Sequence, residues 1–277
     1  MDIDYNGMRS TGYTIATVNS SNVDRAVTCL VSNGTTTTYW DSSDASIGRA
    51  AQSINSDGTR IAGCSTPMPG NFVAAWWSTL AAVGSAPNLF PGTSELTRTV
   101  AQGVSADGRL IVGHGEVLTG GHYTRVFRWD TSDHSYEILA ELPSASESEA
   151  RGISSNGSIT VGWSGTSASP VAAYWAGSSA PVSVGIAGVA TATTADGSII
   201  VGTGDGDVAF VWSAAFGVQL LQDELEDLGV TESADWESAT AVDISHDASV
   251  VVGYGRDATG VERGWVVHLT GTGIAGM

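Results

Sequence analysis

One ten-residue phrase recurs six times along the chain, and this repetition constrains the fold more than any other feature. The copies begin at Ile3, Ile54, Val104, Ile153, Thr193 and Ile244. Each has a turn glycine, replaced by Ala248 in the last copy, and a second glycine five residues later. The turn positions are separated by 51, 50, 49, 40 and 51 residues. Such spacing is typical of repeat arrays in which each copy is one supersecondary unit.

The phrase itself predicts a β-hairpin. A short strand leads into a Ser/Thr-x-Asp/Asn-Gly turn, and a mostly β-branched strand such as Leu110–Val112 follows. The Asp or Asn can bond the local backbone, while glycine takes a positive φ without strain. The six Asp or Asn side chains could instead be metal ligands, but one per hairpin should lie far from the next. They are Asn6, Asp57, Asp107, Asn156, Asp196 and Asp247.

Two further strands are expected in each repeat. A third-strand phrase, often ending in Trp, recurs, as in Val126–Trp129 and Ala209–Trp212, and a fourth β-prone piece such as Tyr136–Leu139 or Val218–Leu221 follows. Four antiparallel strands repeated six times predict an all-β fold, a six-bladed β-propeller of four-stranded blades, with the Trp rings filling the core. An open β-solenoid is the alternative. The propeller would be one domain, 1–277, with repeats at approximately 1–47, 48–97, 98–147, 148–187, 188–236 and 237–277.

The repeat resembles a described family. The pattern Gly-Val-Ser-x-Asp-Gly-x-x-x-Val-Gly, then Ala-Phe-x-Trp, is similar to the HAF-type repeat of predicted extracellular bacterial proteins, most clearly at Gly103–Gly113 and Ala209–Trp212. The resemblance implies a surface or extracellular β-propeller and supplies no catalytic motif. The first ten residues contain neither a cationic nor an apolar signal region, so ordinary secretion is not expected. A virion protein would reconcile these two observations.

Charge excludes some partners. The 11 cations are all Arg and are dispersed among 29 acidic residues, which gives a net charge of −18. A phosphate-binding surface needs clustered cations, so we expect neither nucleic-acid binding nor attachment to an anionic membrane. No run of 18 apolar residues predicts membrane insertion. Cys29 and Cys64 are too few for a disulfide framework, and two buried thiols are expected, although one bridge between them stays open.

The connection after the second glycine varies most in length and is therefore the predicted functional loop, at residues 13–24, 64–71, 114–124, 163–170, 203–207 and 254–262. Rings follow this glycine in four copies, at Tyr13, His114, Trp163 and Tyr254. With Arg256 nearby, they are candidate ligand-binding residues for a glycan or another partner. The alternative is that the rings pack between blades or plug the channel.

Chemistry beyond binding has little support. Asp205 and Asp207 are weak candidates for Ca²⁺, with a solvated turn as the alternative, and no cofactor is expected. A glycan hydrolase would need a carboxylate pair drawn from Glu116, Asp205, Asp207 and Asp257. No sialidase-type Asp-box or Gly-x-Ser-x-Gly elbow in a strand-to-helix context occurs. We therefore expect no enzyme.

Residues 221–228 predict a two-turn helix that ends at Gly229. Its acidic face could meet a basic partner, or the helix could be a solvated linker between repeats five and six.

These observations favour a non-enzymatic interaction module, such as a tail, fibre or decoration protein of a virus particle. Its partners would be other structural proteins of the assembly or a cell-surface glycan or receptor. The alternatives are a bacterial surface or secreted propeller, exported by a non-classical route, that binds glycan or peptide, and a propeller hydrolase.

Overall fold

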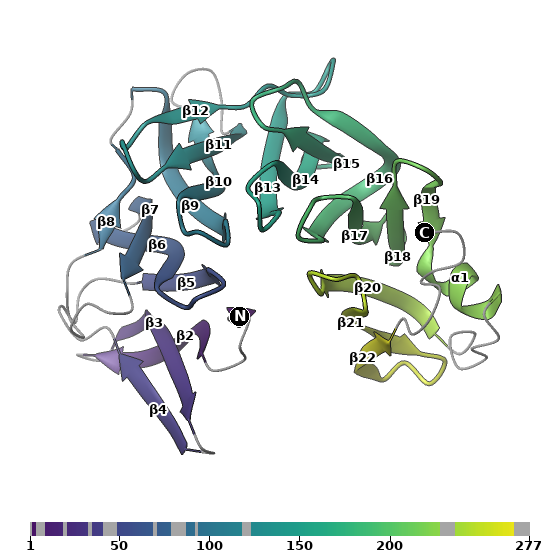
Figure 1. Cartoon of the computed structure of the whole chain (residues 1–277), viewed down its shortest axis with the longest axis horizontal. Coiled ribbons are helices and arrows are strands. Elements are labelled where there is room, and N and C mark those ends of the chain that lie inside the picture. The colour runs from purple at the N-terminus through teal and green to yellow at the C-terminus, as the bar shows by residue number, and fades with distance from the viewer. Residues whose placement is uncertain are drawn as a thin grey trace. The chain divides into compact units, whose positions relative to one another are not determined.

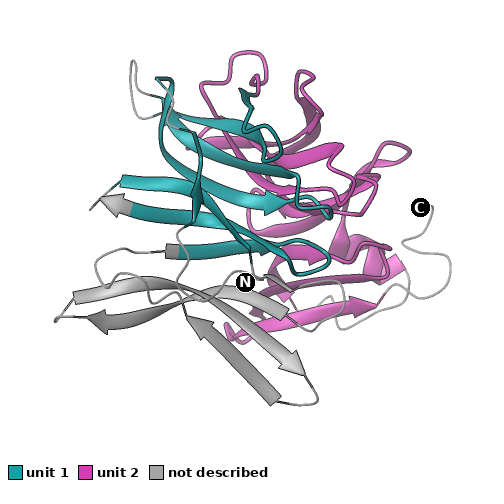
Figure 2. Ribbon diagram, turned by 60° about the vertical axis from the view of Figure 1, so that its left-hand side comes forward, with its two compact units in different colours: residues 1–138 teal, residues 139–277 magenta. Residues whose placement is uncertain are grey.

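A computed structural model describes residues 2–3, 9–18, 21–32, 35–40, 49–68, 71–78, 87–91, 94–117, 123–227 and 236–268. The chain divides into two compact units, residues 1–138 and 139–277, which are coloured separately in Figure 2. Each unit is built from antiparallel sheets, and the strands are labelled in Figure 1.

The described residues of unit 1 form three four-stranded sheets, each joined in simple sequence order. The first consists of β1 (Asp2–Ile3), β2 (Arg9–Val18), β3 (Ser21–Ser32) and β4 (Thr35–Trp40). The second consists of β5 (Arg49–Ile54), β6 (Arg60–Met68), β7 (Asn71–Ser78) and β8 (Asn88–Leu89). The third consists of β9 (Leu96–Val104), β10 (Leu110–Val117), β11 (Thr124–Asp130) and β12 (Tyr136–Ile138). The four-stranded antiparallel repeat expected from the sequence is therefore present.

Unit 2 contains a seven-stranded sheet, one helix and a three-stranded sheet among its described residues. The large sheet runs through β13 (Glu147–Ile153), β14 (Ile159–Thr166), β15 (Ser169–Ala176), β16 (Val182–Thr193), β17 (Ile199–Gly204), β18 (Val208–Ser213) and β19 (Gly217–Leu220). Helix α1 (Leu221–Asp227) follows and confirms the predicted helix. The last sheet comprises β20 (Trp236–Ile244), β21 (Val250–Asp257) and β22 (Glu262–His268).

Strand β16 replaces two separate strands that the sequence suggested. Its first half pairs with β15 and its second half, from Gly188, pairs with β17. The expected boundary between residues 187 and 188 therefore falls inside one continuous strand. The 40-residue period leaves no linker here, and positive φ angles at Gly185 and Gly188 let the chain pass from one repeat into the next.

The hairpin turn has the predicted chemistry in all five described copies. The side chains of Asp57, Asp107, Asn156, Asp196 and Asp247 each accept the backbone N–H two residues later, at 2.9–3.0 Å. Hydrogen bonds from Ser249 and Ser245 help lower the pKa of Asp247 to about 2. The next residue has a positive φ in every copy, including Ala248 at 59°. Asn6 and Gly7 lie outside the described residues.

The turns of unit 2 do not lie far apart, which corrects the expectation from the sequence. The N–H of Asn156 donates to the carbonyl of Ala195, whose own N–H donates to the carbonyl of His246, both at 3.2 Å. Ser155 Oγ also lies 3.0 Å from His246 Nε2. Three hairpin tips from different repeats therefore meet. In the described part of the chain, no group of three or more His, Cys, Asp or Glu side chains is placed to hold a metal.

The second glycine of each described copy faces a β-bulge. The strand before it skips one residue beside Gly63, Gly113, Gly162, Gly202 and Gly253. A Cβ on any of these would overlap a carbonyl oxygen of that strand, for example that of Thr240 at Gly253. At Gly253 it would also overlap the Trp265 ring. Only glycine lets these two strands approach this closely.

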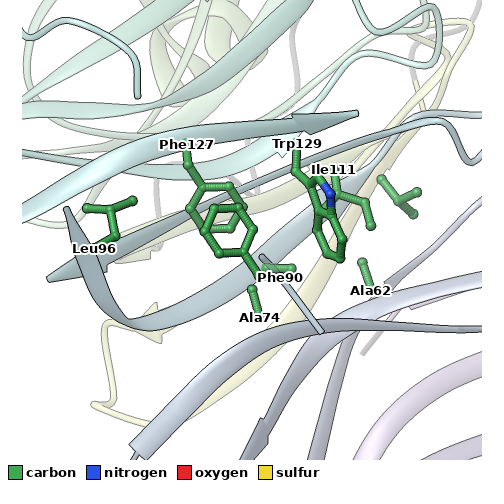
Figure 3. Close-up of a cluster of buried hydrophobic side chains, with 9 residues drawn as sticks. Ala62, Ala74, Phe90, Leu96, Ile111, Phe127 and Trp129 are labelled. Carbon is green, nitrogen blue, oxygen red and sulfur yellow. The ribbon is translucent and has the colours of Figure 1, made fainter. Parts of the chain in front are cut away.

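The prediction that the third-strand Trp residues form core is confirmed for Trp129 and Trp175, while Trp77, Trp212 and Trp265 are partly buried and pack against core clusters. Figure 3 shows a cluster in unit 1 in which the Phe90 ring lies 4.5 Å from that of Phe127 and 5.5 Å, edge-on, from that of Trp129. Phe127 and Trp129 are fully buried. In unit 2, Trp175 is fully buried and its indole N–H donates to the carbonyl of Ala140 at 2.8 Å.

Two smaller expectations concern cysteine and membranes. Cys64 is buried, as expected, while the side chain of Cys29 lies outside the described residues. Among the described helices, none has both the length and the apolar character needed to span a bilayer.

Ala248→Gly should stabilise the protein by about 1 kcal/mol, because glycine adopts the left-handed region without the steric cost that Ala248 carries. The free energy of unfolding from urea titration measures this effect. An unchanged or lower value would show that the last turn does not impose the positive φ in solution.

Gly253→Ala should destabilise the protein by about 2–3 kcal/mol, because the methyl group has no room between the Thr240 carbonyl and the Trp265 ring. Gly264 provides a matched control on the neighbouring strand, since a Cβ added there would lie 3.7 Å from its nearest neighbour. Gly264→Ala should change stability by less than about 0.5 kcal/mol. Equal losses in the two variants would contradict this packing argument.

Candidate functional site

The predicted ring residues lie within strands, which corrects the expectation that they begin functional loops. His114 is in β10, Trp163 in β14 and Tyr254 in β21, while Tyr13 is in β2 with its side chain outside the described residues. The strands continue past the second glycine because backbone pairing extends beyond it, to Thr166 opposite Ser169 in β14. Much of the length variation is therefore variation in hairpin length.

Their burial differs widely. Trp163 is only 5% exposed, and its indole N–H donates to Glu149 Oε2 at 3.3 Å. Little of this ring is available for stacking on a ligand. Tyr254 is 47% exposed and shares one face of β21 with the exposed Arg256, two residues further on. Of the predicted ligand-binding set, Tyr254 and Arg256 are thus brought together by their strand, and ligand binding by the set stays a prediction.

Three of the four carboxylates considered for metal binding or hydrolysis, those of Asp205, Asp257 and Glu116, have local partners. Asp205 and Asp207 lie exposed in the turn between β17 and β18, where Asp205 Oδ1 accepts the N–H of Gly206. Asp257 accepts hydrogen bonds from Arg263 and Thr259, which lower its pKa. Glu116 forms an ion pair with Arg98 at 3.2 Å. Each position is explained by turn or strand structure.

A cavity of about 240 Å³ lies between α1 and the last sheet, and the sequence did not predict it. We call it the α1 pocket. Figure 1 shows α1 following β19 and lying beside the sheet β20–β22. Its described lining is mostly apolar and consists of Val208, Ala209, Leu220, Leu221, Gln222, Asp223, Leu225, Trp236, Glu237, Ser238, Ala239, Trp265, Val266 and Val267.

Two indoles form one wall of the α1 pocket. Trp236 lies over Gly255 and Trp265 over Gly253, and a Cβ on either glycine would approach the indole closer than 3.0 Å. The alternating glycines of β21 therefore provide the space that these rings occupy. Large rings held on a glycine-lined strand give a broad apolar surface of fixed position.

Helix α1 contributes another part of the lining. Leu221 and Leu225 are four residues apart and so lie on one face of α1. Leu221 is buried and Leu225 is partly buried in the core cluster that also contains Ala209 and Val251, with Trp265 packed against it. This packing fixes the helix against the sheet.

The charged residues that line the α1 pocket are both acidic. Asp223 and Glu237 line it, and the described lining contains no Arg or His. On α1 itself, Glu226 and Asp227 are exposed, whereas Glu224 is buried and accepts a hydrogen bond from Gln219 Nε2 at 2.6 Å. Burial raises the pKa of Glu224, and the neighbouring charges of Asp227 and Asp223 add to this rise. The pocket thus combines an apolar interior with a negative rim.

Part of the α1 pocket could be predicted from the sequence. The sequence predicts the helix and its acidic face, and a basic partner is one of the two interpretations of that face. Trp236 and Trp265 are 29 positions apart, and only the pairing of β20 and β22 with β21 brings them onto one wall.

Comparison with known proteins identifies the fold. No protein-family model and no curated protein matches the sequence. Among solved structures, TolB from Acinetobacter baumannii is similar with a TM-score of 0.54 and 14% identity, over 79% of this chain and 53% of that one. A putative TolB from Agrobacterium tumefaciens matches with a TM-score of 0.55 and 13% identity, over 96% and 88% of the two chains.

An acylaminoacyl peptidase from Pyrococcus horikoshii matches with a TM-score of 0.56 and 11% identity, over 94% of this chain and 42% of the peptidase. The chain thus spans about half the length of the first TolB and about two fifths of the peptidase. At this level of identity the likeness shows the fold alone, which is that of a β-propeller.

Glu224→Gln should remove a pH-dependent loss of stability. Because the folded-state pKa of Glu224 is raised above its ordinary 4.5, the stability present below that value is lost as pH rises through the folded pKa. The variant keeps the acceptor for Gln219 and should equal the wild type at pH 4 but exceed it at pH 7. Urea unfolding at several pH values tests this, with the exposed Glu226→Gln as control. If the free energy of unfolding varied with pH in the same way in the wild type and in Glu224→Gln, the prediction would be contradicted.

Proposed function

We propose that this protein is a non-enzymatic interaction module, a six-bladed β-propeller that binds a partner through the α1 pocket. The observation that carries the proposal is the apolar lining of this cavity, to which the last sheet contributes Trp236 and Trp265 and α1 contributes Leu221 and Leu225. Binding sites are concave and mostly apolar, with a few placed polar groups. The α1 pocket has this character, whereas three of the four carboxylates suggested for hydrolysis, those of Glu116, Asp205 and Asp257, are engaged in local contacts.

The size of the cavity favours an anchor from a larger partner. Small-molecule pockets commonly enclose about 300–1,000 Å³. At about 240 Å³, the α1 pocket has room for one or two large side chains. Interfaces often concentrate their binding energy in such an anchor.

Support for six blades comes from the repeat. Five described copies of the phrase form the same turn and the same glycine-facing bulge, and the seven-stranded sheet divides at β16 into two repeat units. The HAF-type resemblance favours a position on a particle or cell surface. We accordingly propose a structural or host-contacting virion component, whose presence in purified particles is the direct test of that setting.

Peptide selection tests the binding site. Peptides selected from a random display library on the full-length protein should bind Ala239→Met at least tenfold more weakly, because Ala239 lines the pocket and the longer side chain fills it. Ala214→Met, at an exposed turn position, is the matched control and should leave affinity unchanged. Isothermal titration calorimetry measures both, and thermal unfolding checks that both variants fold. Equal affinity for the two variants, or cleavage of the bound peptides, would overturn the proposal.

A further inference from the structure

The α1 pocket reaches a strand at the edge of a sheet. Trp265, Val266 and Val267 all line it, and successive side chains of a strand point to opposite faces. Four consecutive residues of β20, Trp236–Ala239, line it as well, so the pocket extends over the sheet face that carries the indoles and reaches β22. This strand pairs with β21 on one side and is the last strand of its sheet in the part of the chain that the structure describes.

The edge of β22 has the features of a strand-addition site. Edge strands present backbone N–H and C=O groups that an extended peptide can pair with. Val266 is 58% exposed, the most exposed of the large hydrophobic residues described. Trp265 also keeps its buried indole N–H without a hydrogen-bond partner among the described residues, although buried donors are normally satisfied.

Charge identifies the kind of segment that fits. The described lining contains Asp223 and Glu237 but no cation, and the exposed Glu226 and Asp227 extend the negative surface along α1. Glu262, at the start of β22, is exposed as well. Complementary charge steers association and disfavours acidic competitors.

We propose that the occupant of the α1 pocket is an extended basic segment of a partner protein, which pairs with β22 and inserts an apolar side chain between the indoles and α1. This inference rests on the proposed function, since it names the partner chemistry of the same site. Alternating Lys or Arg and aliphatic residues fit it best, because a strand then presents its apolar residues on one face and its cations on the other.

The probe is a fluorescein-labelled eight-residue peptide of alternating lysine and valine or leucine, measured by fluorescence anisotropy with the full-length protein. Asp223→Asn combined with Glu237→Gln should weaken its binding about tenfold and flatten its salt dependence. The control removes two exposed carboxylates of unit 1, Glu95→Gln with Asp133→Asn, and should leave binding unchanged. Equal losses in both double variants would indicate a general charge effect and overturn the proposal.

Two modified peptides test the remaining elements. N-methylation of the backbone amides on one edge should abolish binding if the peptide pairs with β22, whereas unchanged affinity would overturn strand addition. A glutamate-for-lysine peptide should bind at least a hundredfold more weakly, and equal binding would overturn the charge argument.

The chain's own residues 269–277 are a competing occupant. If the lysine peptide binds only after Ile274→Asp, then that segment fills the site and the proposal is wrong. The selected peptides could instead be neutral or acidic and still lose affinity for the Ala239→Met variant. This result would overturn the inference of a basic partner and leave the proposed function standing. If no selected peptide binds the Ala239→Met variant more weakly than the wild type, the proposed function itself is overturned.

Discussion

The close approach of the preceding strand to the second glycine of each of the five copies Gly63, Gly113, Gly162, Gly202 and Gly253 is the constraint on which the rest of this structure depends. At Gly253, the Thr240 carbonyl and the Trp265 ring occupy the space that a Cβ would need. The bulge in the preceding strand turns that carbonyl inward, and the absent side chain accommodates it. The same arrangement at Gly113 and Gly202 holds Phe127 and Phe210 against the sheet, so this one device also positions the core rings.

The candidate site uses the same device. On β21, Gly253 and Gly255 alternate with Tyr254 and Arg256, so one face accepts two indoles while the other carries a ring and a cation. The indole face meets α1 and encloses the α1 pocket. A glycine that faces a large ring also occurs in other repeats. The last sheet has two such glycines, because Trp236 adds a second ring beside Trp265.

The fold and the function are supported by different observations. Similarity to TolB and to a peptidase shows a β-propeller, a fold that serves many functions. The argument for binding comes from the α1 pocket, where apolar walls, an edge strand and a negative rim coincide. The exposed Tyr254 and Arg256 lie on the opposite face of β21, where ligand binding stays a prediction from the sequence.

The sequence by itself determined the repeat, the hairpin turns, the aromatic core positions and the short acidic helix, because each depends on neighbouring residues or on a period of 2 or 3.6. The tertiary structure decided where the hairpins end, that Trp163 is buried against Glu149, that β16 serves two repeats and that Trp236 and Trp265 form one wall. These features depend on register and bulges, which join residues distant in the chain. A one-residue shift in pairing reverses the face of every side chain, so only the assembled sheets fix which rings are buried and which surround a cavity.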